Sequence, residues 1–306
     1  MRIVRFYSHR LGPRLGVVNG EEVIDITRIG GRRINSFLQL LKIASKKGLS
    51  ISEYLENKMK NNAAKSYLYS ELDIRPSNSK SHLLIPIIPP EVWGAGVTYL
   101  RSKDAREYET RAKGVYDQVY DAERPEIFLK ATRNRCVGPN QDVYIRSDSN
   151  WTVPEPELAL VLGPNLEIAG YTVGNDVSAR DIEGENPLYC PQAKIYKNAC
   201  AIGPAILTAD SVDNPRNLKI EMRIFRDGNL VFQGETNTGM MKRTFEELRE
   251  YLLRDNPIPP GTVFMTGTGI VPPDDFSLQN NDIIEITIEK IGTLRNRAVK
   301  NHLRSV

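Results

Sequence analysis

The alternation of apolar and polar positions predicts two different architectures along the chain. In the first part, the stretch 15–26 consists of two β-rich runs around an Asn-Gly dipeptide, which is typical of a tight hairpin. The stretch 35–48 has apolar residues at helical spacing behind a capping residue, Asn35 or Ser36. We therefore expect a small α/β domain over residues 1–80 at the N-terminus.

From residue 86 onward, short β-rich runs follow one another, separated by Gly, Pro, Asn and Asp turns. Helical patterns are few, and the two clearest cover residues 102–122 and 241–255. Many strands with helices as insertions predict an α+β fold dominated by β structure, a mixed β-roll or sandwich over residues 86–306. A stretch rich in Pro, Ser and Asn at 76–79 predicts the linker between the two domains.

Composition and charge narrow the class of protein. The 306 residues are 40% apolar and 26% charged, with a net charge of +3, which is typical of a soluble globular protein. We see no basic stripe that would suit nucleic acid, no signal-peptide pattern and no apolar run long enough for a membrane span. The three cysteines form no CxxC motif, so we expect reduced thiols in a cytoplasmic protein.

Two carboxylates, Glu155 and Glu157, stand at the entrance of the apolar run Leu158–Leu162. Residues two apart in a strand point to the same face, so both carboxylates project together while the alternating prolines face the other way. Prolines at the start of a strand predict an edge or a bulge. Two anions at the rim of a partly dry cavity repel each other unless a proton or a cation lies between them.

A third carboxylate, Asp176, is expected just past the end of a strand over Tyr171–Val173. Three carboxylates suit a hard cation, Mg²⁺ first and Mn²⁺ or Ca²⁺ next, and the region holds no histidine that would favour zinc. Asp181 or Glu183 could replace Asp176 as the third ligand. The simpler interpretation is a solvent-facing pair of glutamates and an aspartate in a turn.

Five segments, in this order along the chain, resemble the motifs of the fumarylacetoacetate hydrolase family: EIFLKA, PEPELALVL, GNDVSARD, QAKIYKNACAIGP and VFMTGTGIV. The resemblance covers roughly residues 86 to 295. It implies a β-roll fold, a Mg²⁺ site at Glu155, Glu157 and Asp176, and assembly as a homodimer or homotetramer.

The resemblance is closer to one branch of this family, the 2-keto-3-deoxy-D-arabinonate dehydratases of thermophilic archaea. The segments PPEVWGAGVTY, RPEIFLKATRNRCVG and LRDNPIPPGT carry it. Family hydrolases have a water-activating histidine where this chain has Ser102, and the dehydratases also lack it. The resemblance implies a Mg²⁺-dependent hydro-lyase that converts 2-keto-3-deoxy-D-arabinonate, or a close sugar acid, into 2,5-dioxopentanoate in pentose breakdown. One departure is Lys197, which stands where the family has an aspartate.

We expect roles for five side chains, and those of Glu126 and Lys194 are implied by the same resemblance. Dehydration removes a proton from C3 and a hydroxyl from C4, and Glu126 and Lys194 are the candidate base and acid, in either order. Phe128 and Lys130 share one strand face; we expect Phe128 to line the pocket and Lys130 to face the anionic substrate or the ligand carboxylates. Thr268, between two glycines, is expected to bind the substrate carboxylate. Without the resemblance, a salt bridge, an edge carboxylate and a surface lysine would explain these charged residues.

Two features near the ligands have simpler expectations. We expect Arg180 to pair with Asp181, with Glu183 or with a backbone carbonyl rather than with substrate. The segment 184–192, rich in Pro, Gly and Asn, is predicted to form a loop over the pocket, with the character of a lid.

Two other functions are compatible with the pattern. The first is a hydrolase or decarboxylase of the same fold that acts on acylpyruvates or oxaloacetate, which would need a base other than the missing histidine. The second is a non-catalytic oligomeric binding protein stabilised by its metal. The sequence leaves open the stereochemistry of the sugar acid, the physiological metal and the number of subunits.

Overall fold

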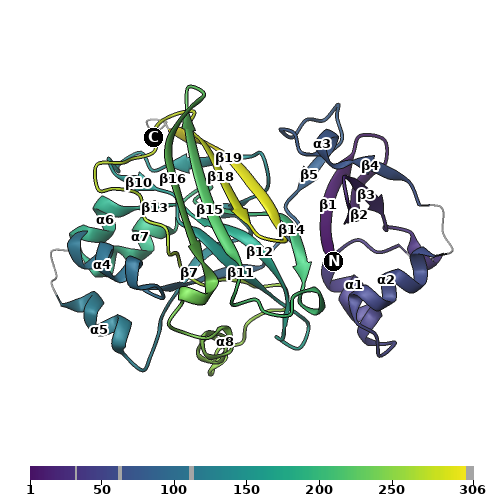
Figure 1. Ribbon diagram of the computed structural model, residues 1–306, viewed down its shortest axis with the longest axis horizontal. Helices are drawn as coiled ribbons and strands as arrows, with labels where there is room; N and C mark the ends of the chain where they lie inside the picture. Colours follow the sequence, from purple (N-terminus) through teal and green to yellow (C-terminus); the bar gives the residue numbers. More distant parts are fainter. Residues whose placement is uncertain (32, 61–63, 110–113, 301–306) are drawn as a thin grey trace.

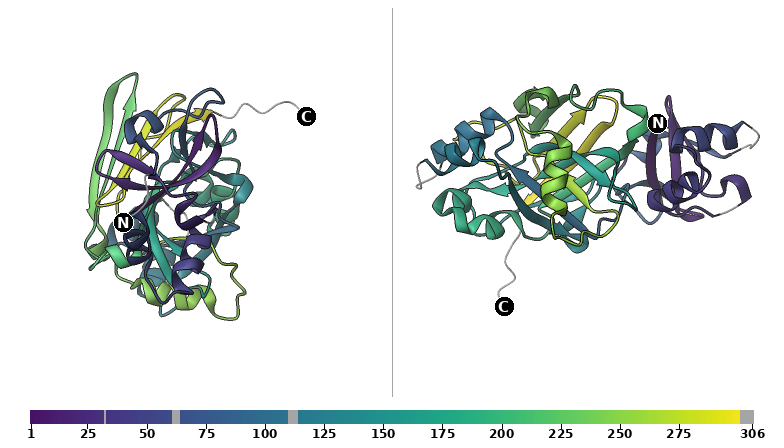
Figure 2. Two further views of the ribbon diagram at one scale, coloured as in Figure 1. Left: turned by 90° about the vertical axis from the view of Figure 1, so that its right-hand side faces the viewer. Right: turned by 90° about the horizontal axis from the view of Figure 1, so that it is seen from below.

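The computed structural model describes residues 1–31, 33–60, 64–109 and 114–300. The molecule is elongated, and the N-terminal elements form one end of it (Figures 1 and 2). Within the described ranges, no helix combines the length and apolar character that a bilayer crossing requires. Part of the helix predicted over 102–122 falls on residues 110–113, which lie outside the described ranges.

The N-terminal end contains a hairpin and short helices, as the sequence pattern predicts. Its elements are β1 (Arg2–Ser8), β2 (Gly12–Asn19), β3 (Glu22–Asp25), α1 (Phe37–Ser45), α2 (Ile51–Met59), β4 (Ser66–Leu68) and α3 (Tyr69–Leu72). The hairpin turns at Gly20, whose φ of 58° suits glycine. Ser36 caps α1, because its side chain accepts a hydrogen bond from the backbone N–H of Gln39.

One large sheet connects this end with the rest of the molecule. Its strands run in the order β4-β3-β2-β1-β14-β12-β11-β17-β6-β7, with β5 beside β1 and β8 beside β14. The members not yet introduced are β5 (His82–Leu84), β6 (Glu91–Gly96), β7 (Glu126–Thr132), β8 (Cys136–Val137), β11 (Pro156–Leu162), β12 (Ile168–Asp176), β14 (Cys200–Thr208) and β17 (Val263–Met265). Because β1 pairs with β14 through Arg2↔Leu207 and Ile3↔Ile206, the sheet crosses the predicted boundary near residue 80. The division into 1–80 and 86–306 stays a prediction.

A second sheet packs against the first. Its order is β16 (Asn229–Asn237), β15 (Lys219–Arg226), β18 (Ile283–Ile288), β19 (Gly292–Lys300) and β9 (Asp142–Ile145). Leu160 of β11 and Val173 of β12 share one core with Ile220 of β15 and Ile286 of β18, and all four are fully buried. Figure 1 shows β15, β16 and β18 lying over β11 and β12. The prediction of a β-dominated α+β sandwich is therefore confirmed.

The apolar run of β11 is explained by burial on both faces. Leu158, Leu160 and Leu162 face the second sheet, whereas Ala159 and Val161 join the core that includes α1 and α2. A strand covered on both sides reads as continuously apolar, because neither face meets water.

The edge position predicted from the prolines is wrong, since β11 lies between β12 and β17. Pro156 is the first residue of the strand, and pairing with β17 begins only at Ala159. The missing N–H of Pro156 therefore interrupts no ladder bond to β17.

Helices gather around one end of the two sheets. They are α4 (Leu100–Glu109), α5 (Val115–Asp121), α6 (Arg180–Glu185) and α7 (Cys190–Lys194). The two-stranded pair β10 (Thr152–Val153) and β13 (Ser178–Ala179) lies beside them. The remaining helix, α8 (Phe245–Leu253), lies apart from this group. The loop predicted over 184–192 is wrong, because a 3-10 turn at Pro187–Tyr189 leads directly into α7. Proline is favoured in the first turn of a helix, and here Pro187 begins the 3-10 turn while Pro191 is the second residue of α7.

Candidate metal centre and active site

Three acidic side chains meet where β11 begins and β12 ends. Glu155 precedes β11, Glu157 lies within it, and Asp176 is the last residue of β12 rather than beyond its end, because the strand continues through Gly174. The backbone N–H of Asp176 donates to the carbonyl of Glu155 at 3.0 Å, which aligns the two strand ends. One oxygen from each carboxylate lies within 4.8 Å of the others, and all three residues are buried.

Lys194, at the end of α7, reaches into this group of carboxylates. Its Nζ lies 2.5 Å from Oε2 of Glu155 and 3.2 Å from Oδ2 of Asp176. It also donates to Oγ of Ser178 at 2.6 Å. The Phe128 ring lies 5.6 Å from the same Nζ and forms an apolar wall beside it. The ammonium therefore contacts the oxygens that would bind a cation.

Two further buried cations, Lys130 and Arg180, form ion pairs with these carboxylates. Nζ of Lys130 lies 2.5 Å from Oδ1 of Asp176 and donates to the carbonyls of Val177 and Lys194 at 2.9 Å and 2.7 Å. An ammonium has three protons, so these partners use all its donors. This geometry favours the alternative in which Lys130 faces the ligand carboxylates over contact with substrate.

Arg180 pairs with Glu155, an acid that sequence reasoning did not name as its partner. Its Nη2 lies 2.8 Å from Oε1 of Glu155, and both side chains are almost fully buried. Asp181 instead accepts from Oγ of Ser149 at 2.6 Å and from the backbone N–H of Asn150 at 2.7 Å. Asp181 is therefore turned away from the three-carboxylate group.

Glu157 is a ligand candidate whose surroundings disfavour its charged form. Its Oε2 accepts the backbone N–H of Gly267 at 2.5 Å. Burial, followed by the nearby charges of Asp176 and Glu155, raises the pKa of the Glu157 carboxyl well above its ordinary value. A buried carboxylate in this position needs a proton or a cation to neutralise it. Three buried carboxylate oxygens form a hard donor set, so the residues present fit Mg²⁺.

This raised pKa predicts a pH dependence for the metal-free protein. A group whose pKa is higher in the folded state contributes stability that is fully present below its unfolded pKa and is lost as pH rises through the folded value. We therefore expect the free energy of unfolding, measured by urea denaturation in EDTA, to fall as the pH rises above 4.5, the ordinary pKa of a glutamate carboxyl. The Glu157→Gln variant should lack this part of the slope, and an identical slope in the variant would contradict the assignment.

The pocket in front of the carboxylates is narrow, with room for about 10 Å³, close to the space of one water molecule. Its walls come from β6 and the residues after it, from β7, from α4, α6 and α7, and from the turn after β17: Ala95, Gly96, Val97, Ser102, Glu126, Phe128, Glu183, Lys194, Gly267 and Thr268. The structure thus brings Glu126, Phe128, Lys194 and Thr268 to one pocket with the three acids. Their catalytic and binding roles stay predictions.

Thr268 lines the pocket but has local partners. Its hydroxyl donates to the carbonyl of Ile270 at 3.1 Å and accepts the backbone N–H of Ile270 at 3.2 Å. The neighbouring N–H of Gly267, one candidate for a substrate carboxylate, already serves Glu157. Gly267 has a φ of 93°, and a Cβ there would lie 2.0 Å from Oγ1 of Thr98. The glycine is therefore required for this turn to approach Glu157.

Sequence reasoning missed two residues of the site, and each had a signal. Ser178 lies two residues after Asp176 in an extended segment, so the two share a face; its hydroxyl donates to the Asp176 carbonyl at 3.1 Å. Glu183 was considered as a ligand and as a partner of Arg180, but not as a wall of the pocket; it lines the pocket with Oε2 4.0 Å from Nζ of Lys194, outside the group of three ligand candidates.

Comparisons with known proteins agree with this geometry. The family model described as "Fumarylacetoacetate (FAA) hydrolase C-terminal" matches residues 91–299. The 2-dehydro-3-deoxy-D-arabinonate dehydratase of Saccharolobus solfataricus is 55% identical over 213 residues, which are 68% of this chain and 72% of the relative. The human mitochondrial oxaloacetate tautomerase FAHD2A is 29% identical over 317 residues, 98% of this chain and 92% of the relative.

A solved structure extends the likeness over the whole chain. It is described as 2-keto-3-deoxy-D-arabinonate dehydratase complexed with magnesium and 2,5-dioxopentanoate, and it is 41% identical to this chain. The two superimpose with a TM-score of 0.81 over 99% of this chain and 100% of the other.

Proposed function

Because the chain belongs to the fumarylacetoacetate hydrolase family, we propose that it is a Mg²⁺-dependent hydro-lyase that dehydrates 2-keto-3-deoxy-D-arabinonate, or a close sugar acid, to 2,5-dioxopentanoate. The observation that carries this proposal is the buried group of Glu155, Glu157 and Asp176 with Lys194 in contact. The solved dehydratase with magnesium and 2,5-dioxopentanoate supports both the reaction and the metal.

The chemistry needs a stabilised enolate and a base beside C3. When bound, Mg²⁺ supplies positive charge to the 2-keto oxygen of the substrate. Lys194 is the best-placed base, because its Nζ contacts the same carboxylates and therefore lies beside the carbons of a keto acid held there. To act as the base, Lys194 must first lose the proton that makes it an ammonium beside Glu155 and Asp176. Its amine then takes the C3 proton, while Lys130 and Arg180 keep Asp176 and Glu155 in position.

Glu126 is then left as the acid. It begins β7 opposite Gly96 of β6, and its carboxylate lies over that glycine at the wall of the pocket. As the C4–O bond breaks, the Glu126 carboxyl gives its proton to the departing hydroxyl, which leaves as water. The enone that results, with its double bond between C3 and C4, converts to the 2-keto aldehyde by isomerisation: C5 and its hydroxyl each lose a proton, and C3 and C4 each gain one.

Gly96 offers a direct test of the position of Glu126. A Cβ at residue 96 would lie 2.0 Å from Oε2 of Glu126, which is the movable end of a side chain. We expect Gly96→Ala to displace this carboxylate and lower kcat by about 10²-fold, the lower end of the contribution of an acid–base group. Mg²⁺ affinity and melting temperature should stay near wild-type values. A variant with normal kcat would contradict the role given to Glu126.

The hydrolase alternative is less well supported. Ser102 of α4 is buried and lines the pocket in place of the histidine, and the described lining residues include no histidine that could activate water. The test is to supply Mg²⁺ with 2-keto-3-deoxy-D-arabinonate, an acylpyruvate and oxaloacetate in parallel. We expect aldehyde formation from the sugar acid alone. Pyruvate release from the other two would favour hydrolysis or decarboxylation, and turnover of none would favour a binding protein.

Assembly and location complete the proposal. We expect a homodimer or homotetramer, because exposed Leu230 and Val231 lie on the edge strand β16, where a second copy would cover them. None of the three cysteines, which all lie in the described ranges, forms a disulfide, as in a cytoplasmic protein. Light scattering on the purified protein measures the number of subunits.

A further inference from the structure

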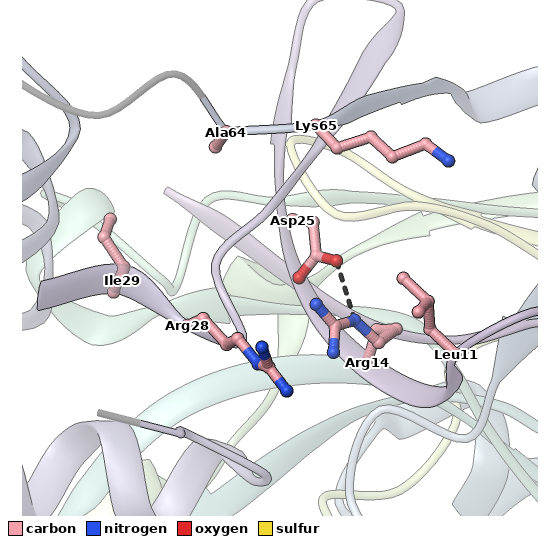
Figure 3. A pocket seen from close by; sticks show the side chains of 7 residues that line it. All are labelled: Leu11, Arg14, Asp25, Arg28, Ile29, Ala64 and Lys65. Atoms are coloured by element: carbon pink, nitrogen blue, oxygen red, sulfur yellow. Dashed lines mark hydrogen bonds and ion pairs between the residues drawn. The ribbon is translucent and has the colours of Figure 1, made fainter. Parts of the chain in front are cut away.

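A second cavity lies at the N-terminal end, formed by β2, β3 and the chain on either side of them. It measures about 220 Å³ and is lined by Leu11, Arg14, Asp25, Arg28, Ile29, Ala64 and Lys65 (Figure 3). Figure 1 places β2 and β3 at the opposite end of the molecule from α6 and α7, so this cavity is separate from the carboxylate pocket. Three of its lining side chains are cationic and one is acidic.

Arg14 of β2 is mostly buried, and its partner Asp25 uses only part of its hydrogen-bonding capacity. Its Nε donates to Oδ2 of Asp25 at 2.7 Å, and the two side chains are 11% and 5% exposed. The other oxygen of Asp25 accepts the backbone N–H of Thr27 at 2.9 Å, so Asp25 is fixed. Within the described ranges, neither terminal nitrogen of Arg14 has a hydrogen-bond partner. Four N–H donors of a guanidinium held by packing therefore remain available.

Arg28 brings a second guanidinium to the same cavity. It follows Thr27 at the end of β3, and no carboxylate among the described residues pairs with it. Figure 3 shows the guanidinium groups of Arg14 and Arg28 turned toward a common space. Lys65 also lines the cavity, but Figure 3 shows its side chain directed away from the two arginines, and its Nζ lies 4.8 Å from the Tyr67 ring. Two guanidinium groups that face one space repel each other, and an anion between them would neutralise that repulsion.

We infer that this cavity is a binding site for a small oxyanion, a phosphate or carboxylate group held by Arg14 and Arg28. Planar guanidinium groups bind such oxygens in pairs, which a lysine does not do. A volume of about 220 Å³ is below the usual range for drug-sized ligands, so the ligand has the size of phosphate or a short dicarboxylate. Leu11, Ile29 and Ala64 supply an apolar wall for a carbon chain. The inference does not depend on the proposed dehydration.

The test is calorimetric titration of the full-length, Mg²⁺-loaded protein at low ionic strength, with inorganic phosphate in one arm and succinate in the other. We expect saturable 1:1 binding in at least one arm; phosphate alone or succinate alone identifies the group recognised. Arg28→Gln should weaken it at least about ten-fold, as expected for loss of charged hydrogen bonds.

Two further variants make the result specific. Lys47→Gln removes the same charge from an exposed position after α1, outside the cavity, and should leave the affinity unchanged. Arg14→Lys keeps the charge and the Asp25 ion pair but loses the paired donors, so it should weaken binding as Arg28→Gln does. Absence of saturable binding in both arms, or equal affinity in wild type and Arg28→Gln, would overturn the inference.

Discussion

Replacing Glu157 with glutamine is expected to abolish Mg²⁺ binding and to lower kcat/KM for the sugar acid by at least about 10³-fold, which corresponds to roughly 4 kcal/mol of transition-state stabilisation. The reason is that the amide can still accept the N–H of Gly267 but carries no charge for the cation. The neutral side chain also imitates the protonated acid that the raised pKa of Glu157 favours in the metal-free protein. The fold should therefore survive the change.

Of the three ligand candidates, Glu157 is the one whose replacement carries the least risk to the fold. Glu155 and Asp176 each neutralise buried cations, so replacing either would leave Arg180, Lys130 or Lys194 without a counter-charge and could unfold the protein. Calorimetry with Mg²⁺ and steady-state kinetics give the two readouts. Glu246→Gln, at an exposed carboxylate of α8, is the matched control and should behave as wild type. Normal Mg²⁺ affinity in Glu157→Gln would contradict the assignment of these three carboxylates as the Mg²⁺ site.

The second prediction with a large expected effect distinguishes the catalytic base from the catalytic acid. In deuterated water, Lys194→Met should lose both dehydration and exchange of the C3 hydrogen, because no group takes the proton. Glu126→Gln should lose dehydration but continue to exchange the C3 hydrogen, because the enolate still forms and only the departure of the hydroxyl is blocked. Each variant should lower kcat by about 10²- to 10⁴-fold. Mass spectrometry of recovered substrate measures the exchange.

A control variant accompanies the comparison of Lys194→Met with Glu126→Gln. Lys197→Met removes the same functional group three residues along the chain, where an exposed Nζ lies 5.1 Å from the Tyr144 ring, and it should leave both reactions intact. If Glu126→Gln stops exchange while Lys194→Met permits it, the two roles are reversed. If both variants exchange normally, neither residue is the base.

Local periodicity accounts for the part of the structure that sequence reasoning predicted. The i, i+2 spacing of Glu155 and Glu157 and the apolar run after them are properties of one strand, so no distant contact was needed to predict a shared face. The hairpin before β3 and the Ser36 cap are equally local. The family resemblance added Glu126, Lys194 and the likeness to dehydratases.

The side-chain partners that sequence reasoning did not predict depend on contacts between segments far apart along the chain. Arg180 pairs with Glu155 across 25 residues, and Lys130 meets the carbonyl of Lys194 across 64. Such partners follow from how β7, α6 and α7 surround the strand ends, and spacing along the chain does not encode that. The proline-rich segment 184–192 misled in the same way, because its prolines begin short helices rather than a loop.

The pairing of β1 with β14 has a consequence for synthesis of the protein. Arg2 and Ile3 are translated some two hundred residues before their ladder partners Leu207 and Ile206. Until then this stretch of β1 has an open edge, a template for pairing with other nascent chains. This strand therefore needs protection from such pairing until β14 has been synthesised, and a product truncated before β14 would be prone to aggregate.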